Sequence, residues 1–437
     1  MKDTRFYSYL GAAILSALSA MLGNFVDGII VSQLVSADGL SAINLCKPIS
    51  QFYYTYHQLF GLGGAMLVAM ALGAKDEKRV SDLLRITIGL IALFSAVVAL
   101  LGIICPNVVV GWLCNNPSLT DDTLAYARPL LIGSGAYMGV LLLSVLTAID
   151  GAPKLVSVAM VVDNLVNLGL DLLFMGVFDW GIEGSSTATI IGHLVGIAIL
   201  STHYVKGKSK MKILPQRSSF RLTADAAKTG APFAIASICL TFYMLLANRM
   251  ILGMENGKES IYIFSVMTNL LVIYNFFISG SCQTLQQLGS LQVGEGDIPG
   301  LKSTTKRCFR FMMICQGLIC VYLLIDAQSF CHLFECPENL LSECCFAARI
   351  YSFAFFAFSV NYLMMVYLKL TKHGGIANFI SITLSPIVLP FIWISTRFAP
   401  HMLWWSNLIG YGIVLVVIAL WMIFNRKNDE QLLTKQE

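Results

Sequence analysis

The chain has 437 residues, of which 57% are hydrophobic and only 12% are charged, and its mean hydropathy is +0.73. Soluble proteins carry about 25% charged residues, so this composition indicates an integral membrane protein. The formal charge of +4 is too small to predict a nucleic-acid partner. Apolar segments and short loops fill almost the whole chain, which leaves no room for a soluble catalytic domain. The phosphate-loop pattern Gly-x-x-x-x-Gly-Lys-Ser/Thr is absent, which argues against direct use of ATP.

The sequence contains twelve apolar blocks, each close to or above the ~20 residues that a membrane-spanning helix needs. They cover residues 7–34, 42–72, 86–112, 124–149, 155–177, 184–205, 226–252, 260–290, 308–325, 344–368, 375–396 and 402–424. The first block is too long for the apolar core of a cleaved signal peptide, so we interpret it as a retained span. The pattern predicts an all-α integral membrane protein with twelve transmembrane helices.

The basic residues predict the orientation of these spans. With the N-terminus in the cytoplasm, 23 of the 29 Lys and Arg residues fall on the inner side. Three, Arg128, Lys258 and Arg397, fall outside, and the other three, Lys47, Arg249 and Arg349, lie within spans. Because inner loops of membrane proteins are enriched in Lys and Arg, we expect both termini to be cytoplasmic.

A basic stretch at 206–228 divides the chain into six spans and six spans. Glycine-rich turns with a following Asp recur at matching places, at Gly73–Asp76 after the second span and at Gly294–Asp297 after the eighth. Chance similarity between two loops is the alternative. An even number of spans in each half predicts two six-helix lobes related by a parallel pseudo-twofold repeat. The expected divisions are an amino-terminal lobe at 1–205, a basic cytoplasmic linker at 206–224, a carboxy-terminal lobe at 225–425 and a cytoplasmic tail at 426–437.

Polar stripes follow one face of the second and eighth spans. The residues are Asn44, Lys47, Gln51, Tyr54 and Gln58 in the second span, and Asn275, Ser279, Gln283, Gln286 and Ser290 in the eighth. Polar faces inside a membrane must meet protein or water. Two stripes at equivalent places favour a substrate cavity between the halves, although hydrogen bonds between helices are the alternative. An aromatic row in the tenth span, from Tyr351 to Tyr362, is more typical of packing than of substrate binding.

Two carboxylates lie inside apolar spans, Asp27 in the first and Asp171 in the fifth. A charged side chain at membrane depth costs roughly 2.5–3.5 kcal/mol on insertion scales, so such residues usually line a functional cavity. Asp163, Asn167 and Asp171 share one helical face because they are spaced four residues apart.

Further oxygen-bearing side chains are expected at the same depth. These are Asn24 in the first span, Asn164 in the fifth and Thr189 in the sixth. A desolvated pair of carboxylates can take up a proton near neutral pH, and the same oxygens can hold Na⁺. We therefore predict a cation-coupling site here. The alternative is a static salt bridge with Lys47 or Arg249.

With these residues in view, the chain resembles the multidrug and toxic-compound extrusion (MATE) family over nearly its whole length. The matching segments are Asp27–Val31, Leu72–Asp76, Asp150–Lys154, Asn164–Asp171, Gly181–Gly184, Thr187–Thr189, Gly230–Pro232 and Leu291–Asp297. The resemblance implies twelve helices in two lobes. It also implies export of amphipathic, often cationic compounds in exchange for H⁺ or Na⁺ by alternating access, in the cytoplasmic (inner) membrane of a bacterium or archaeon.

By this resemblance, the amino-terminal cation site consists of Asp27, Asn167, Asp171 and Thr189, which are possible Na⁺ ligands. The chain departs from some relatives in having no carboxylate in the seventh or tenth span, so a second ion site in the carboxy-terminal lobe is not expected. Lys47 and Arg249 make the expected cavity less purely anionic.

Two other functions compete with a cation-coupled exporter. A flippase of lipid-linked glycans shares the general architecture but predicts a strongly basic cavity. A membrane-embedded enzyme needs a catalytic group, and we interpret His57 and His193 as packed or cavity histidines. We expect a monomer that meets small-molecule substrates and membrane lipid, with no cofactor besides the coupling ion. Cys331 and Cys336 flank an outer loop and are candidates for a disulfide.

Overall fold

The computed structural model describes residues 5–19, 37–113, 117–212, 221–334 and 336–434. Within these ranges the chain is helical and contains no strand, which confirms the predicted all-α class. The chain separates into two compact units, Met1–Ala231 and Pro232–Glu437. The boundary falls inside one long helix, at Pro232.

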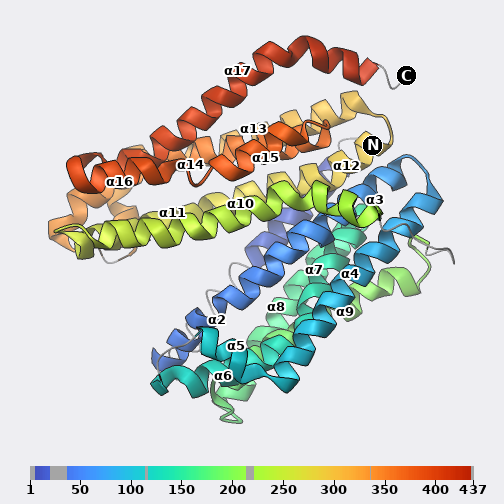
Figure 1. Cartoon of the computed structure of the whole chain (residues 1–437), viewed down its shortest axis with the longest axis horizontal. Coiled ribbons are helices and arrows are strands. Elements are labelled where there is room, and N and C mark those ends of the chain that lie inside the picture. Colours follow the sequence, from blue (N-terminus) through green and yellow to red (C-terminus); the bar gives the residue numbers. More distant parts are fainter. Residues whose placement is uncertain (1–4, 20–36, 114–116, 213–220, 335, 435–437) are drawn as a thin grey trace. The chain divides into compact units, whose positions relative to one another are not determined.

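The first unit is a bundle of helices of unequal length. Besides the helix at 5–19, it contains α2 (Ala37–Tyr56), the π-helical turn η1 (His57–Leu62), α3 (Gly63–Gly73), α4 (Glu77–Ile104), α5 (Pro106–Leu113), α6 (Pro117–Ile132), α7 (Ser134–Ile149), α8 (Pro153–Gly176), α9 (Gly181–Val205) and the beginning of α10 (Arg221–Leu252). The short α5 and α6 lie together at one end of the unit, and α3 lies at the other (Figure 1). Asp76 precedes α4 and Pro153 begins α8, so a cap and a proline fix where these two spans start.

The second unit contains the remaining helices. They are the rest of α10, α11 (Gly257–Thr284), the π-helical turn η2 (Leu285–Gly289), α12 (Ser290–Gly294), α13 (Ile298–His332), α14 (Glu338–Leu370), α15 (Gly374–Thr383), α16 (Val388–Phe398), the 3₁₀ turn η3 (Pro400–Trp405) and α17 (Ser406–Thr434). Figure 1 shows α11, α13, α14 and α15 running side by side. The helix α14 is at the centre of this unit, because it packs against α11, α13, α15 and α17.

The number of spans agrees with the sequence pattern. Ten helices of the described residues are long and apolar enough to cross a membrane. Thr120–Ile132 and Ser134–Ile149 pass the same test only as a pair and meet at a bend of 51°, so the number rises to eleven when this pair is counted as one span. Counted in this way, the helices of the described residues match the second to twelfth predicted spans, whereas most of the first, 7–34, lies outside the described residues. The protein is therefore a multi-pass membrane protein.

The backbone of the loops repeats between the two units. A shift of 221 residues carries Lys75 onto Gly296 and Gly151 onto Lys372, and all four residues have a positive φ, between 58° and 96°. In both units the first of these residues precedes a capping Asp. Asp76 Oδ1 accepts a hydrogen bond from the backbone N–H of Arg79, and Asp297 Oδ1 accepts one from that of Gly300. The recurring Gly-x-x-Asp sequence is thus a turn that begins the next helix.

A π-helical turn interrupts the second span in one unit and the eighth span in the other. These turns are η1 and η2, and each contains one of the predicted cavity glutamines, Gln58 and Gln286. Such turns disturb the regular hydrogen bonding of a helix and are frequent at functional sites. Beside η1, glycine permits the beginning of α10 to come close, because a Cβ on Gly63 or Gly230 would collide with backbone atoms of the other segment.

We expect Asp76→Ala and Asp297→Ala each to lower the free energy of unfolding, by about 0.5–2 kcal/mol, because each substitution removes a helix cap. Thermal unfolding of the purified protein measures the effect. Asp76→Asn and Asp297→Asn are the matched controls and should remain close to wild type, since Asn also caps helices. Equal losses in the Asn and Ala variants would contradict the capping role.

Candidate functional site

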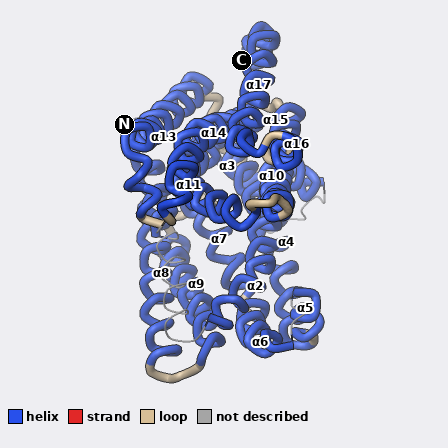
Figure 2. The backbone as a smooth tube through the Cα atoms, turned by 90° about the vertical axis from the view of Figure 1, so that its left-hand side faces the viewer, coloured by secondary structure: helices blue, strands red, loops and turns tan. Residues whose placement is uncertain are grey.

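The helices α8 and α9 lie side by side and are joined by the short loop 177–180 (Figure 2). Gly192 and Gly196 make this close contact possible. A Cβ on Gly192 would lie 2.7 Å from Asp163 Oδ1 and 2.9 Å from the Asp163 carbonyl oxygen, and one on Gly196 would lie 3.2 Å from Asp163 Oδ2. This Gly-x-x-x-Gly spacing is a common way for membrane helices to approach each other. The two glycines therefore leave room for an acidic side chain between the helices.

Asp163 fills that room and pairs with a histidine. The carboxylate is 4% exposed, and its Oδ2 and Oδ1 lie 2.9 Å and 3.2 Å from His193 Nδ1. The imidazole ring also packs edge-on against Tyr137, with the ring centres 5.1 Å apart. His193 is thus packed, as the sequence indicated, but it also binds an acidic partner that the sequence analysis missed. A buried carboxylate requires such a partner, because burial without one is costly.

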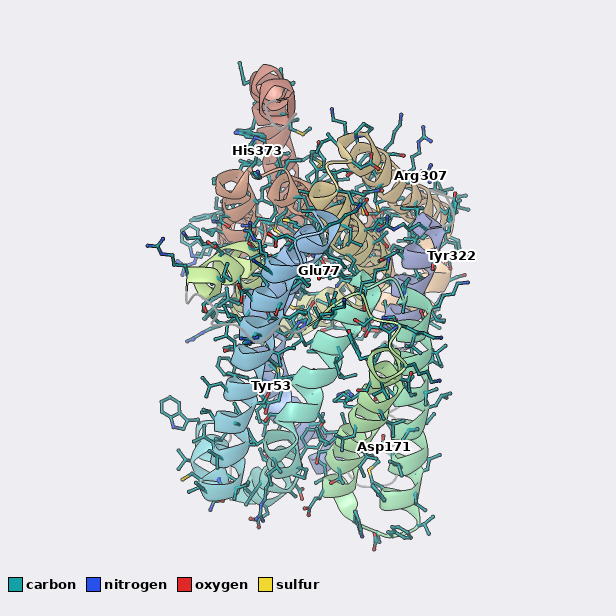
Figure 3. The ribbon with its side chains drawn as sticks, turned by 90° about the vertical axis from the view of Figure 1, so that its right-hand side faces the viewer. Tyr53, Glu77, Asp171, Arg307, Tyr322 and His373 are labelled. Carbon is teal, nitrogen blue, oxygen red and sulfur yellow. The ribbon has the colours of Figure 1, made fainter. Side chains whose placement is uncertain are left out.

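Asn167 and Asp171 continue the same face of α8 toward the loop end of the helix pair. Asn167 Nδ2 donates a hydrogen bond to Thr189 Oγ1 at 3.3 Å, and the Thr189 hydroxyl donates one to the Ser185 carbonyl at 3.1 Å. Asp171 is completely buried. Figure 3 labels Asp171 in this helix pair. Four of the predicted coupling residues, Asp163, Asn167, Asp171 and Thr189, thus belong to one helix pair.

Asn164 lies on a different side of α8 and contacts the first helix. Its Nδ2 donates hydrogen bonds to Ser19 Oγ at 3.0 Å and to the Met160 carbonyl at 2.7 Å. About two turns earlier in α8, Ser157 Oγ donates a hydrogen bond to the carbonyl of Ala12 at 3.2 Å. The helix at 5–19 therefore packs along α8. The remaining two predicted coupling residues, Asn24 and Asp27, lie outside the described residues.

A second Asp–His pair lies at the other end of α9. His203 Nε2 is 2.9 Å from Asp150 Oδ2, and Asp150 Oδ1 accepts a hydrogen bond from the backbone N–H of Lys210 at 2.9 Å. Asp150 belongs to the turn between α7 and α8. The pair therefore ties the beginning of the basic linker to this turn, which gives a structural role to the Asp150–Lys154 segment.

The polar stripe of the second span passes from exposed to buried along α2 and η1. Lys47 is exposed, Tyr54 is 43% exposed and Gln58 is buried. Gln58 Nε2 donates a hydrogen bond to the Tyr54 hydroxyl at 2.9 Å. Gln51 is half-buried, and the side chain of Asn44 lies outside the described residues. At the buried end of this stripe, Tyr54 and Gln58 are therefore hydrogen-bonded to each other.

The stripe of the eighth span behaves similarly. Asn275, Ser279 and Gln283 are half-buried in α11, whereas Gln286 in η2 is buried. The Ser290 hydroxyl donates a hydrogen bond to the Gln286 carbonyl of the preceding turn. Whether the two stripes share one cavity stays a prediction.

The aromatic row of the tenth span forms part of the core of its unit. Tyr351 packs against Trp404 and Phe355, and Phe355 packs against Tyr274. Phe358 contacts Tyr411, with ring centres 5.2 Å apart. These contacts agree with the packing interpretation.

The sequence matches one family model and several characterised proteins. The MatE family model matches residues 12–173, a stretch that includes Asp163 and Asp171. The multidrug export protein MepA of Staphylococcus saprophyticus is 19% identical over 435 residues, and that of Staphylococcus aureus is 20% identical over 440 residues. Each alignment covers 96% of both chains.

Solved structures agree over the full length. A MOP superfamily transporter from Pyrococcus furiosus gives a TM-score of 0.86 at 17% identity, with 99% of this chain and 96% of that chain covered. A MATE transporter solved in a bent and in a straight conformation gives 0.86 for each at 16% identity, with 99% and 97% covered. These comparisons support a MATE family transporter. The fold agrees with that of these transporters, as the sequence predicted.

We expect Gly192→Ala to destabilise the protein by about 1–3 kcal/mol, the usual cost of overpacking. The added methyl group would lie too close to the backbone and carboxylate of Asp163. Gly169→Ala on α8 is the matched control, because a Cβ there has nothing within 4 Å. Thermal unfolding in detergent measures both, and equal stability of the two variants would contradict the close-packing account.

A double-mutant cycle tests the Asp163–His193 pair. We expect Asp163→Asn and His193→Asn to be non-additive, with a coupling energy of about 0.5–3 kcal/mol, as for other residues in contact. The free energy of unfolding of the wild type, both single variants and the double variant gives this value. Strict additivity would mean that the two side chains do not interact.

Proposed function

We propose that this protein is a transporter of the MATE type, a secondary active exporter of amphipathic, often cationic compounds that it exchanges for H⁺ or Na⁺ by alternating access. We also propose that it acts as a monomer in the cytoplasmic membrane of a bacterium or archaeon, with both termini in the cytoplasm. The names of the staphylococcal relatives, multidrug export proteins, support the class of cargo. The orientation rests on the inner excess of Lys and Arg.

The observation that carries the coupling proposal is the burial of Asp171, one helical turn from Asn167, which is hydrogen-bonded to Thr189. A fully buried carboxylate is unfavourable when it is ionised and lacks a compensating cation. A proton neutralises it directly. The amide and hydroxyl oxygens on the same helix pair also provide the ligand type that Na⁺ accepts. The donor set therefore fits either coupling ion.

Cation binding at this place has a direct route to the first helix. The part of that helix at 5–19 is already held against α8 by Asn164 and Ser157. If Asp27 joins Asp171 at the ion, binding and release of the ion change how the first helix is held on α8. A ligand shifts a conformational equilibrium by its differential affinity for the two states, so the ion would favour one access state and the cargo the other.

Dye efflux from proteoliposomes tests this function. An amphipathic cationic dye is loaded, and an H⁺ gradient or a Na⁺ gradient is imposed in separate arms. We expect wild type to export the dye under at least one gradient. Asp27→Asn and Asp171→Asn should abolish that efflux, because neither can bind the ion as a carboxylate does.

Asp121→Asn is the matched control, because Asp121 is exposed near the beginning of α6, and this variant should transport as wild type does. Undiminished efflux in both Asp27→Asn and Asp171→Asn would refute the coupling site. Wild-type protein that moves a lipid-linked glycan but no dye would instead support the flippase.

A further inference from the structure

Four cysteines gather at the end of α13 and the beginning of α14. They are Cys331, Cys336, Cys344 and Cys345, and all are free thiols in the structure. The Sγ atoms of Cys331 and Cys345 are 3.8 Å apart. Cys344 makes side-chain hydrogen bonds with both Cys331 and Cys336. The four thiols therefore form one continuous sulfur cluster.

A break in α13 produces this cluster. Asp326 has a non-helical backbone (φ −137°, ψ 68°), and its side chain caps the following turn by accepting a hydrogen bond from the N–H of Ser329. The chain then folds back, so that the Cys331 carbonyl accepts hydrogen bonds from the N–H groups of Phe334 and Cys336. As a result, Cys331 faces the first turns of α14.

Neighbouring side chains hold this arrangement in place. Arg349 Nε donates a hydrogen bond to the Leu323 carbonyl, which the break leaves available. Tyr262 of α11 donates to the Phe334 carbonyl at 2.8 Å. Three helices thus position the thiols, and the cluster is not the product of one mobile loop.

We propose that Cys331 and Cys345 form a disulfide by exchange with an external low-molecular-weight disulfide. Their sulfur atoms are 3.8 Å apart, whereas a disulfide bond is about 2.05 Å long, so the two side chains must rotate toward each other for the bond to form. Cys345 is partly exposed, while Cys331, Cys336 and Cys344 are buried. Cys345 is therefore the thiol that the external disulfide reaches first.

The exchange proceeds in two balanced steps. Cys345 loses its proton, and its thiolate attacks one sulfur of the external disulfide, which forms a mixed disulfide and releases one thiolate. Cys331 then loses its proton and attacks Cys345 Sγ, which releases the second thiolate. The protein loses two protons and two electrons, and the external disulfide is reduced to two thiols.

The contact geometry selects this pairing over Cys331–Cys336, the pair that the sequence suggested. Cys336 instead makes a hydrogen bond with the Cys344 thiol and donates one, at 3.8 Å, to the Pro337 carbonyl. The proposed orientation places the cluster on the outer side of the membrane, where conditions favour disulfides. The inference is otherwise independent of transport.

Mass spectrometry of the purified full-length protein tests the proposal. The partly exposed Cys105, Cys239 and Cys315, together with Cys114, are first replaced by Ser to remove other reactive thiols. After treatment with oxidised glutathione, we expect most of the protein to lose the mass of two hydrogen atoms. Peptide mapping should join Cys331 to Cys345.

Two variants and one control make the test decisive. Cys331→Ser should trap one glutathione on Cys345, because no thiol is left to complete the second step, and Cys345→Ser should form neither product. Cys336→Ser is the control and should oxidise as the parent does. A bond from Cys331 to Cys336 or Cys344, no oxidation of the parent, or no adduct on Cys345 in Cys331→Ser would overturn the proposal.

Discussion

The close contact between α8 and α9 is the constraint on which the site depends. Acidic groups inside a membrane helix are tolerated only when a partner compensates their charge or polarity. Here the partners come from the neighbouring helix, with His193 bound to Asp163 and Thr189 bound to Asn167. Gly192 permits the approach, because any side chain at its position would collide with Asp163. Close packing and the chemistry of the site therefore have the same origin.

The two units share the backbone turns of an internal repeat, but only the first unit contains the candidate ion site. The shift of 221 residues relates backbone turns of the two units, and in each unit a capping Asp begins the third helix of the half. These features depend on local backbone geometry, so they recur in both halves. The acidic row of α8 has no counterpart in the eleventh span, where the same shift places Leu384, Val388 and Ile392. The repeat thus supplies two similar frames, and only the first carries the candidate ion site.

Much of this could be predicted from the sequence, because the relevant patterns are local. Twenty-residue apolar blocks predict spans, and a spacing of four residues places Asp163, Asn167 and Asp171 on one face whatever surrounds the helix. Contacts between helices are not encoded in this way. The sequence therefore does not predict the partners of His193 and His203. Two local signals do point to the contact: Thr189 and His193 are four residues apart, and Gly192 and Gly196 have the spacing of closely packed helices. The sequence does not predict the break at Asp326 either. This break brings Cys331 close to Cys345, whereas the sequence suggested a pair with Cys336.

The central claim is that a cation and the cargo compete through the buried carboxylates of the first lobe. The most direct measurement is the affinity of purified protein for a transported dye, determined over a range of H⁺ concentrations and, separately, of Na⁺ concentrations. The account predicts that dye affinity of the wild type falls as one of these cations rises, and that affinity of Asp171→Asn does not respond to either. Wild-type affinity that is independent of both cations, or an Asp171→Asn variant that responds as wild type does, would contradict it.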